Sequence, residues 1–373
     1  MKHFLTALLL LSLLFQAGCA RSTPDGTSGP QAESPQLAYE ATFDDGAFSP
    51  IDPGAVCYDL LEIRLCVLDE EAAKALFFPE DPILEENSRE DNGRRGYNVR
   101  GASGSYLHIT NSSRGKLDSD LYFRTLWYQE MFDNLVINNP ADMGSFNLNN
   151  VDDLPRDGDL DFAPAAEAEA AVRYALGQIG CKKLGESMEA VIVSPLSRET
   201  LAFLDKSNPR YDFDYETQEK IQIPLQSWGK EDECYYLSFQ GQYGGIPFSR
   251  EGVKYPGPHI EAVYSPRGIE FLCILSPFEV VKPGQPVDMP DPAAARELIA
   301  GKYDKIILPY PVIIQQGSLE YVMPSSGAGL IPSWRVIVND VDCVTDEETG
   351  ESFSNRHHHL LDALTGKEIV WTR

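Results

Sequence analysis

The sequence has none of the short motifs that mark the commonest hydrolases. It contains no His-Glu-x-x-His, no Gly-x-Ser-x-Gly, and no Ser-x-x-Lys with its companion motifs. The Gly-Ala-Ser-Gly stretch at 101–104 lacks the spacing of a nucleophile elbow. We therefore predict a non-enzymatic protein that needs no cofactor. A catalytic site built from residues distant in sequence is the open alternative.

Paired thiols and basic charge are scarce as well. None of the seven cysteines belongs to a Cys-x-x-Cys pair, which argues against a structural zinc site. Lys and Arg number 31 against 57 Asp and Glu, and the formal net charge is −26. Such a field repels phosphate groups, so we expect neither nucleic-acid binding nor electrostatic attachment to anionic lipids. The acidity suits a protein at the cell surface, and equally one that meets basic partners.

Long apolar runs are also missing, except at the start of the chain, where Phe4–Phe15 follows Lys2. This run is too short to span a membrane and predicts a signal peptide over 1–18. Gln16-Ala17-Gly18 before Cys19 resembles a lipobox, although that pattern usually has Leu where Gln16 stands. We expect an acyl lipid such as palmitate on Cys19 and a protein anchored outside the cytoplasm. A plain secretory signal is the alternative.

Six further cysteines permit disulfides outside the cytoplasm but do not specify their connectivity. Cys57 and Cys66 flank a stretch that a hairpin could bridge, and we predict that they lie close together as the candidate disulfide. Buried free thiols are expected for Cys181, Cys234, Cys273 and Cys343.

The first half of the chain changes from a tether to a β-rich region. Residues 19–36 are rich in Ser, Thr, Gly, Pro and Gln, and predict a flexible tether. Alternating segments predict a β-rich N-terminal domain over 37–150, with one short helix at 69–78. The polar stretch 78–104 is typical of a long loop or a mobile excursion.

The second half combines helices with antiparallel strands. An Ala-rich helix at 163–180 and a helix capped by Ser197 belong to an α+β unit over 160–283, which also contains a hairpin turning at 265–268. A helix that begins at Asp291-Pro292 and closes at Gly301 opens a second, shorter unit over 288–373. The predicted fold class is α+β, with antiparallel sheets each packed with one or two helices.

Two stretches near the C-terminus carry a family resemblance. Leu-Ile-Pro-Ser-Trp-Arg-Val-Ile-Val at 330–338 and Leu-Leu-Asp-Ala-Leu-Thr-Gly-Lys-Glu-Ile at 360–369 resemble the last strands of PepSY-like modules, as in regulatory proteins of the YycH/YycI type. The preceding segments are similar to uncharacterised lipoproteins of Gram-positive anaerobes. The resemblance covers roughly residues 160–373 at motif level. It implies PepSY-like units that bind or inhibit other proteins or sense at the envelope, with no catalytic residue to carry over.

The most specific part of this resemblance also has a local physical basis. Asp362 can accept backbone N–H bonds at the end of a strand, and Gly366 supplies the positive φ that lets the chain reverse. Trp334, on a facing strand, is expected to bury its ring. Leu360 and Leu361 should lie on opposite faces of the closing strand, with at least one in the core.

Three consecutive histidines precede this turn. On a strand, His357 and His359 share one face and His358 takes the other. Two imidazoles at this spacing can share a transition metal, and the acidic stretch at 340–348 could supply further ligands. The alternative, which we favour, is the exposed entry to an edge strand. His357 and His359 are thus weak metal candidates.

Other candidate residues are each better explained by structure. The acids of 157–161 alternate as in a calcium loop, but Phe162 stands in place of the required Gly and Glu169 comes one residue late. His108 and His259 have no recognisable partner in the sequence. Aromatic side chains at 122–128 and 235–239 fall on both faces of their strands, so half should be core, and the exposed half could stack on a sugar or a peptide.

These observations predict a membrane-anchored extracytoplasmic lipoprotein that acts as a non-enzymatic binding or regulatory module at the cell envelope. Its expected partner is an envelope protein or peptide. A solute- or glycan-binding lipoprotein is the first alternative, and an envelope hydrolase is the second.

Overall fold

The structure is a computed structural model that describes residues 39–370 apart from 40, 49, 113–118, 133–153, 208–210, 215–218, 223, 251–252, 254–255, 307, 325–326, 328 and 346–351. The predicted signal peptide, the tether and Cys19 lie outside the described residues. Residues 39–373 form one compact unit. Its strands are mostly antiparallel and its helices few, which confirms the α+β fold class.

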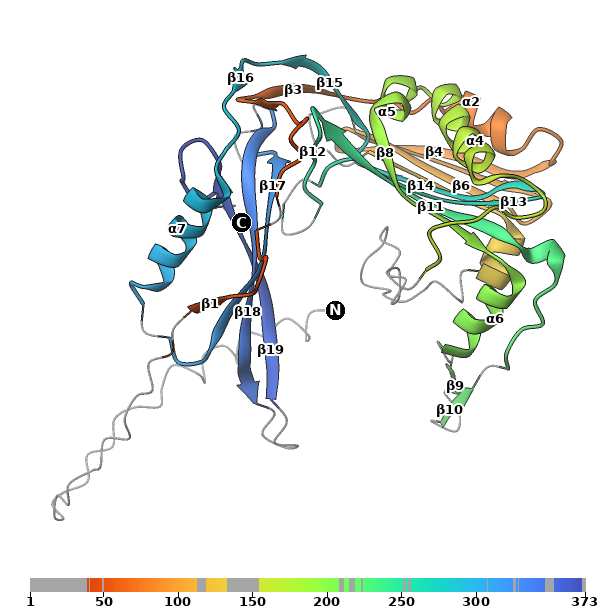
Figure 1. The fold of residues 1–373 in the computed structure, drawn as a ribbon. Helices are drawn as coiled ribbons and strands as arrows, with labels where there is room; N and C mark the ends of the chain where they lie inside the picture. Colours follow the sequence, from red (N-terminus) through yellow and green to blue (C-terminus); the bar gives the residue numbers. More distant parts are fainter. Residues whose placement is uncertain are drawn as a thin grey trace, which may run out of the picture. The chain divides into compact units, whose positions relative to one another are not determined.

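The larger sheet has nine strands (Figure 1). Its order from one end is β12-β11-β13-β14-β7-β6-β5-β4, and β8 pairs with β11 on the side away from β13. The strands are β4 (Ile83–Asp91), β5 (Arg94–Gly101), β6 (Tyr106–Ser112), β7 (Asp120–Arg124), β8 (Met188–Leu196), β11 (Cys234–Tyr243), β12 (Ile246–Pro247), β13 (His259–Ser265) and β14 (Gly268–Leu275).

Helices cover both faces of this sheet. One face packs against α2 (Glu70–Phe77), α4 (Ala165–Gln178) and α5 (Lys182–Ser187) in a core that includes Leu176 and Leu237. The opposite face, at β11, β13 and β14, packs against α6 (Arg198–Ser207) and the π-helical turn η1 (Tyr128–Phe132). Alternate residues of β11, β13 and β14 therefore belong to two separate cores.

The second sheet has four strands in the order β1-β17-β18-β19. Strands β17 (Val312–Val322), β18 (Ile331–Thr345) and β19 (Ser352–Asp362) are antiparallel neighbours, and β1 (Ala41–Phe43) adds a parallel strand. Helix α7 (Pro292–Tyr303) packs on this sheet through Ala295 and Ile299. The core between them also contains Trp334 and Leu361.

Short two-stranded ribbons make up the remaining strand pairs of the described chain. They are β15 (Phe278–Pro283) with β3 (Leu61–Leu65), β16 (Pro286–Val287) with β2 (Cys57–Tyr58), and β9 (Tyr211–Asp214) with β10 (Glu219–Gln222). A 3-10 turn, η3 (Lys230–Asp232), precedes β11.

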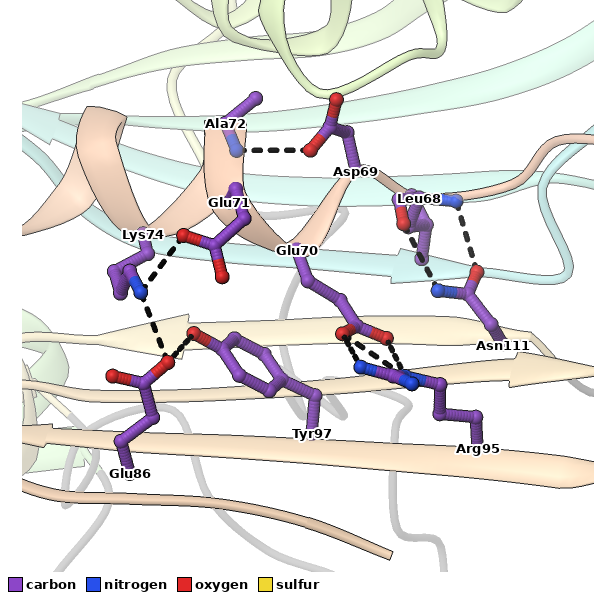
Figure 2. Close-up of polar contacts among 10 residues, drawn as sticks. All are labelled: Leu68, Asp69, Glu70, Glu71, Ala72, Lys74, Glu86, Arg95, Tyr97 and Asn111. Carbon is purple, nitrogen blue, oxygen red and sulfur yellow. Dashed lines mark hydrogen bonds and ion pairs between the residues drawn. The ribbon is translucent and has the colours of Figure 1, made fainter. Parts of the chain in front are cut away.

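Polar contacts fix α2 on the edge of the larger sheet (Figure 2). Asp69 caps the helix by accepting from the Ala72 N–H at 3.0 Å. Arg95 on β5 forms a bidentate salt bridge with Glu70, in which Arg95 Nη2 lies 2.8 Å from Glu70 Oε2. Lys74 lies 2.9 Å from Glu86 on β4. Each ion pair has at least one exposed member, Arg95 or Glu86, so the contacts orient the helix more than they stabilise it.

Several local predictions are confirmed. The expected helices correspond to α2, α4, α6 and α7, and the Ser197 hydroxyl accepts from the Thr200 N–H at 3.3 Å. The hairpin turn at 265–268 joins β13 to β14. Asp362 Oδ1 accepts from the Leu364 and Thr365 N–H groups at 2.9 and 3.0 Å, and Gly366 has φ +69°. Helix α7 differs at its end, since it continues past Gly301 to Tyr303.

The stretch 78–104 is ordered, unlike the predicted loop. It forms the β4–β5 hairpin, whose turn places Asn92 and Gly93 at φ +50° and +78°. These angles suit the tight primed turns that favour Asn-Gly. Pattern analysis missed the hairpin because β4 is exposed on both faces and so has no apolar alternation.

The domain boundaries also differ from the prediction. Strands β4–β7, from the expected domain 37–150, lie in one sheet with strands from 160–283, because β7 pairs with β14. Strand β1 instead joins the sheet of 288–373 through Ala41 and Val312. Strand pairing between distant segments therefore joins regions that the sequence analysis had assigned to separate domains.

Candidate functional site

The predicted histidine pair lies beside the end of α7. His357 and His359 share one face of β19, as alternation predicted, and their ring centroids are 5.1 Å apart. Tyr303 closes α7 and reaches both rings. We call the group of Lys302, Tyr303, Asp340, His357, His359 and Glu368 the histidine–tyrosine network.

The Tyr303 hydroxyl is the centre of this network. It lies 3.1 Å from His357 Nε2 and 2.9 Å from His359 Nε2. A hydroxyl carries one proton, so in its neutral form it donates to one imidazole and accepts N–H from the other. The two histidines therefore hold complementary tautomers.

Charged side chains contact the Nδ1 atom of each histidine. His359 Nδ1 lies 3.0 Å from Lys302 Nζ and 2.9 Å from Glu368 Oε1, and these two charges are 2.7 Å apart. His357 Nδ1 lies 3.4 Å from Asp340 Oδ2. The network thus connects the Asp340 carboxylate on β18 to the ion pair between Lys302 and Glu368.

Burial controls the protonation of the network. Burial lowers the pKa of His359 and raises that of Tyr303. Burial alone would raise the pKa of Glu368, but hydrogen bonds from Lys302 and His359 outweigh it and hold that pKa below its usual value. A neutral His359 beside an ionised Glu368 is therefore the favoured state near neutral pH.

The prediction of an exposed strand entry is wrong for His359, whose side chain is only 11% exposed. The His357 side chain is 33% exposed. The expected edge position itself is correct, because β19 ends the sheet order. Helix α7 is what covers the face, and its continuation through Tyr303 was not expected.

Hydrogen bonds already use the histidine nitrogens that a metal ion would need. Both Nε2 atoms already contact the Tyr303 hydroxyl, and a cation there would meet the Lys302 ammonium near by. Within the described ranges of the chain, no three His, Cys, Asp or Glu side chains converge in a metal-binding arrangement. Apart from Asp340, the acidic side chains of 340–348 that could supply further metal ligands lie outside the described residues.

The expected Cys57–Cys66 disulfide is not formed. Both residues are buried and free. Cys57 lies on β2 in the core under the four-stranded sheet, whereas Cys66 follows β3 and packs in the core of the nine-stranded sheet. Strands β2 and β3 pair with β16 and β15 and not with each other, so no hairpin brings the two thiols together. Cys181, Cys234 and Cys273 are buried and free, as expected, and the Cys343 side chain lies outside the described part.

The acids of 157–161 serve the helix that follows them. Asp159 Oδ1 accepts from the Ala165 N–H at 2.8 Å, at the start of α4. Asp161 lies 2.6 Å from Lys230. The structure therefore shows Asp159 bonding the first turn of α4.

His108 lies on a polar surface that the sequence did not reveal. Its Nδ1 lies 2.8 Å from Asn98 Oδ1, and the Tyr106 hydroxyl donates to the same oxygen at 2.8 Å. These strand positions face away from α2. A hollow of about 240 Å³ lies here, lined by Glu85, Asn87, Asn98, Val99, Arg100 and Tyr106.

Aromatic rings and a guanidinium continue this surface. Arg124 lies 5.9 Å from the centroid of the Tyr106 ring and 5.7 Å from that of Tyr122. Trp127 and Tyr128, expected on the same strand as Tyr122, instead follow it in a helical turn, and Tyr128 stacks on Phe271 in the core. Only the first pair of that aromatic segment therefore alternates across a strand.

His259 has a buried partner that sequence reasoning missed. Its Nε2 lies 2.6 Å from Glu261 Oε1, and its Nδ1 donates to the Phe239 carbonyl at 3.0 Å. Both side chains are under 5% exposed. Burial lowers the pKa of His259. The i, i+2 spacing on an expected strand was a usable signal, because such residues share a face.

Comparison with known proteins is limited to the fold. No family model and no curated protein matches the chain. A crystal structure of an uncharacterised protein from Eubacterium rectale ATCC 33656 superposes with a TM-score of 0.55 at 18% identity, covering 88% of this chain and 92% of that one. Among the described residues, no helix is long and apolar enough to cross a membrane. The likeness to the Eubacterium rectale protein shows a shared fold.

Proposed function

We propose that this protein is an extracytoplasmic lipoprotein, anchored through Cys19, that binds an extended segment of an envelope protein without catalysing a reaction. The observation that carries this proposal is the free edge of β4. All nine residues of β4 are exposed, and β4 ends the sheet order; among the described residues it pairs with β5 alone. The signal-like N-terminus supports the location.

An open edge strand is a site to which a second strand can add. Its outward backbone N–H and C=O groups lack a neighbour within the sheet, and peptide-binding domains use such edges for main-chain hydrogen bonds. Strand β4 also exposes Leu84, which is 69% exposed. A partner strand would cover that side chain and complete the backbone pairing.

The charge of β4 indicates the kind of segment that fits. The strand carries Glu85, Glu86, Glu90 and Asp91 against one Arg89, and the whole chain has a formal net charge of −26. An extended segment with basic side chains is therefore favoured over an acidic one. Helix α2 holds β4 in place through Lys74 and Glu86 and so presents the edge in a fixed orientation.

Photocrosslinking in intact cells tests this proposal. A photoreactive amino acid at Leu84, on the β4 edge, should yield a discrete adduct with an envelope protein. The matched control is Tyr174 on α4, which is 63% exposed. Equal adducts from both positions, or none at Leu84, would contradict a binding role for β4.

A PepSY-like identity for the C-terminal part is the second component of the proposal. Helix α7 followed by the antiparallel strands β17, β18 and β19 supports it, as does the Asp362–Gly366 turn. Trp334 on β18 is buried opposite Leu361, in keeping with the tryptophan-bearing strand of that resemblance. The predicted role is protein binding or sensing.

Binding of a glycan or small solute is the second candidate function. It is favoured by the hollow beside Tyr106, where a ring, an amide and a guanidinium converge. At about 240 Å³ the hollow is smaller than the roughly 300–1,000 Å³ typical of drug-sized ligands, so it suits one sugar ring or one side chain. Saccharide-dependent thermal stabilisation that Tyr106→Ala abolishes would favour this function over the edge-strand proposal.

A further inference from the structure

Two chain segments far apart in sequence touch where β3 leads into α2. The Asp69 N–H donates to the Ile179 carbonyl at 3.0 Å. A Cβ on Gly180 would lie 2.9 Å from the Val67 carbonyl oxygen, so the two backbones are in direct contact. Each segment carries a cysteine next to this contact: Cys66 before it and Cys181 after it.

Further bonds hold the first segment rigidly. The Cys66 N–H donates to the Pro277 carbonyl at 2.9 Å. Asn111 on β6 accepts from the Leu68 N–H and donates to the Leu68 carbonyl, both at 2.9 Å (Figure 2). Cys66 is therefore fixed on both sides, and its position relative to Cys181 follows from backbone geometry.

Both cysteines lie in one core. Cys66 is 8% exposed and Cys181 is 1% exposed, and both belong to the core between α2, α4, α5 and the nine-stranded sheet. A hydrogen bond from the Cys181 thiol lowers the pKa of Cys66, and the same contact raises the pKa of Cys181. The two cysteines thus flank a direct backbone contact and share one core.

The other described cysteines are not arranged in this way. Cys57 lies in a different core. Cys234 and Cys273 share a core, but Cys273 pairs with Glu261, which pairs with Ser238 on β11, four residues beyond Cys234. At about 3.3 Å per residue, this places the two roughly 13 Å apart along the strands.

We propose that Cys66 and Cys181 form a disulfide when the chain folds in an oxidising extracytoplasmic compartment. The oxidant is a low-molecular-weight or protein disulfide. The Cys66 thiolate attacks one of its sulfurs and releases one thiolate, giving a mixed disulfide. The Cys181 thiolate then attacks Cys66 Sγ and releases the second thiolate. Two thiols are oxidised, one external disulfide is reduced to two thiols, and the two protons go to those thiols.

Burial sets when this exchange occurs. Both sulfurs are covered in the folded chain, so an external disulfide reaches them during folding, before α4 and α5 close over the sheet. The bond would tie β3 to the corner between α4 and α5 across a long loop of chain. Constraining such a loop in the unfolded state is the usual origin of disulfide stabilisation.

The test uses the full chain, purified in detergent, unfolded and reduced, then refolded in a glutathione redox buffer. Peptide mapping without reduction should recover Cys66 linked to Cys181, with Cys234 and Cys273 as free thiols. Thiol titration after unfolding should show two fewer thiols than in the reduced protein. A full count of free thiols, or a link from Cys66 to any other cysteine, would overturn the proposal.

Variants and melting curves provide the controls. Cys66→Ser and Cys181→Ser should each abolish the link, and Cys273→Ser should retain it. Reductant should lower the melting temperature of the oxidised wild type by several degrees and leave the Cys66→Ala/Cys181→Ala double variant unchanged. Neither a membrane nor a partner takes part, so failure here is distinguishable from failure of the proposed binding function.

Discussion

The Tyr303 hydroxyl lies 2.9 Å from His359 Nε2, and the two rings meet edge to face with centroids 5.9 Å apart. This contact joins the last residue of α7 to the edge strand β19 across 56 residues of sequence. It explains why a histidine expected to be exposed is buried.

Tyr303→Phe should destabilise the protein by about 1–3 kcal/mol, because it removes hydrogen bonds to two imidazoles and leaves their nitrogens without that partner. Urea denaturation measures the change. Tyr174→Phe, on the exposed face of α4, is the matched control and should lie within about 0.5 kcal/mol of wild type. Equal behaviour of the two variants would show that the network contributes nothing.

Stability should fall as the pH drops from 7 to 5, and His359 should account for part of the loss. The unfolded imidazole has a pKa of about 6.5, and burial lowers the folded value. The unfolded state therefore binds more protons in this window, and the contribution is present above about pH 6.5 and lost as pH falls through the folded pKa.

His359→Gln tests this pH dependence by urea denaturation at several pH values. The variant should show a flatter profile between pH 7 and 5, although Lys302, Tyr303, His357 and Glu368 remain around the site. Glu368, whose pKa is lowered, acts in a lower window, below about pH 4.3. A profile that coincides with wild type would rule out His359 as the source.

Asn111→Ala should cost about 1–3 kcal/mol. It removes two hydrogen bonds to Leu68 and leaves a part-buried N–H and carbonyl unpaired. Asn355→Ala, at an exposed position of β19, is the control for losing the same side chain. If both variants unfold at the same urea concentration as wild type, the Leu68 segment is not fixed in the way described.

Leu361→Ala should cost about 2–5 kcal/mol, because the side chain is 5% exposed and packs opposite Trp334. Leu360 is also buried, at 3%. Leu364→Ala, in the following turn at 45% exposure, should cost far less. The ratio of the two effects, read from denaturation midpoints, checks that the closing strand belongs to the core.

Cys19→Ser should release the protein from the membrane fraction and abolish incorporation of a labelled fatty acid. The reason is that one or two acyl chains supply the binding energy for the membrane. Unchanged fractionation of the variant would mean that another segment anchors the chain.

Local chemistry made part of this fold predictable. The cap at Ser197, the helix start at Asp291-Pro292 and the turn from Asp362 to Gly366 depend on neighbouring residues, and all three occur as expected. Sheet membership depends on distant residues instead. The pairing of Ala41 with Val312 and of Phe123 with Leu272 leaves no trace in either segment alone.

The candidate sites were predictable to a smaller degree. Alternation correctly placed His357 and His359 on one face, but their partner Tyr303 comes from a helix end that a glycine was expected to close earlier. Cys66 was assigned to Cys57 by sequence proximity, whereas the cysteine that shares its core, Cys181, lies 115 positions further along the chain. Tertiary packing decided both cases.

Hydrogen–deuterium exchange of β4 tests the central claim most directly. The partner recovered by crosslinking at Leu84 is added to the purified full chain, and exchange is compared with that of the chain alone. Strand addition predicts slower exchange across 83–91, with unchanged exchange in β17, which lies inside the other sheet. Unchanged exchange at 83–91 under saturating partner would contradict binding along the β4 edge.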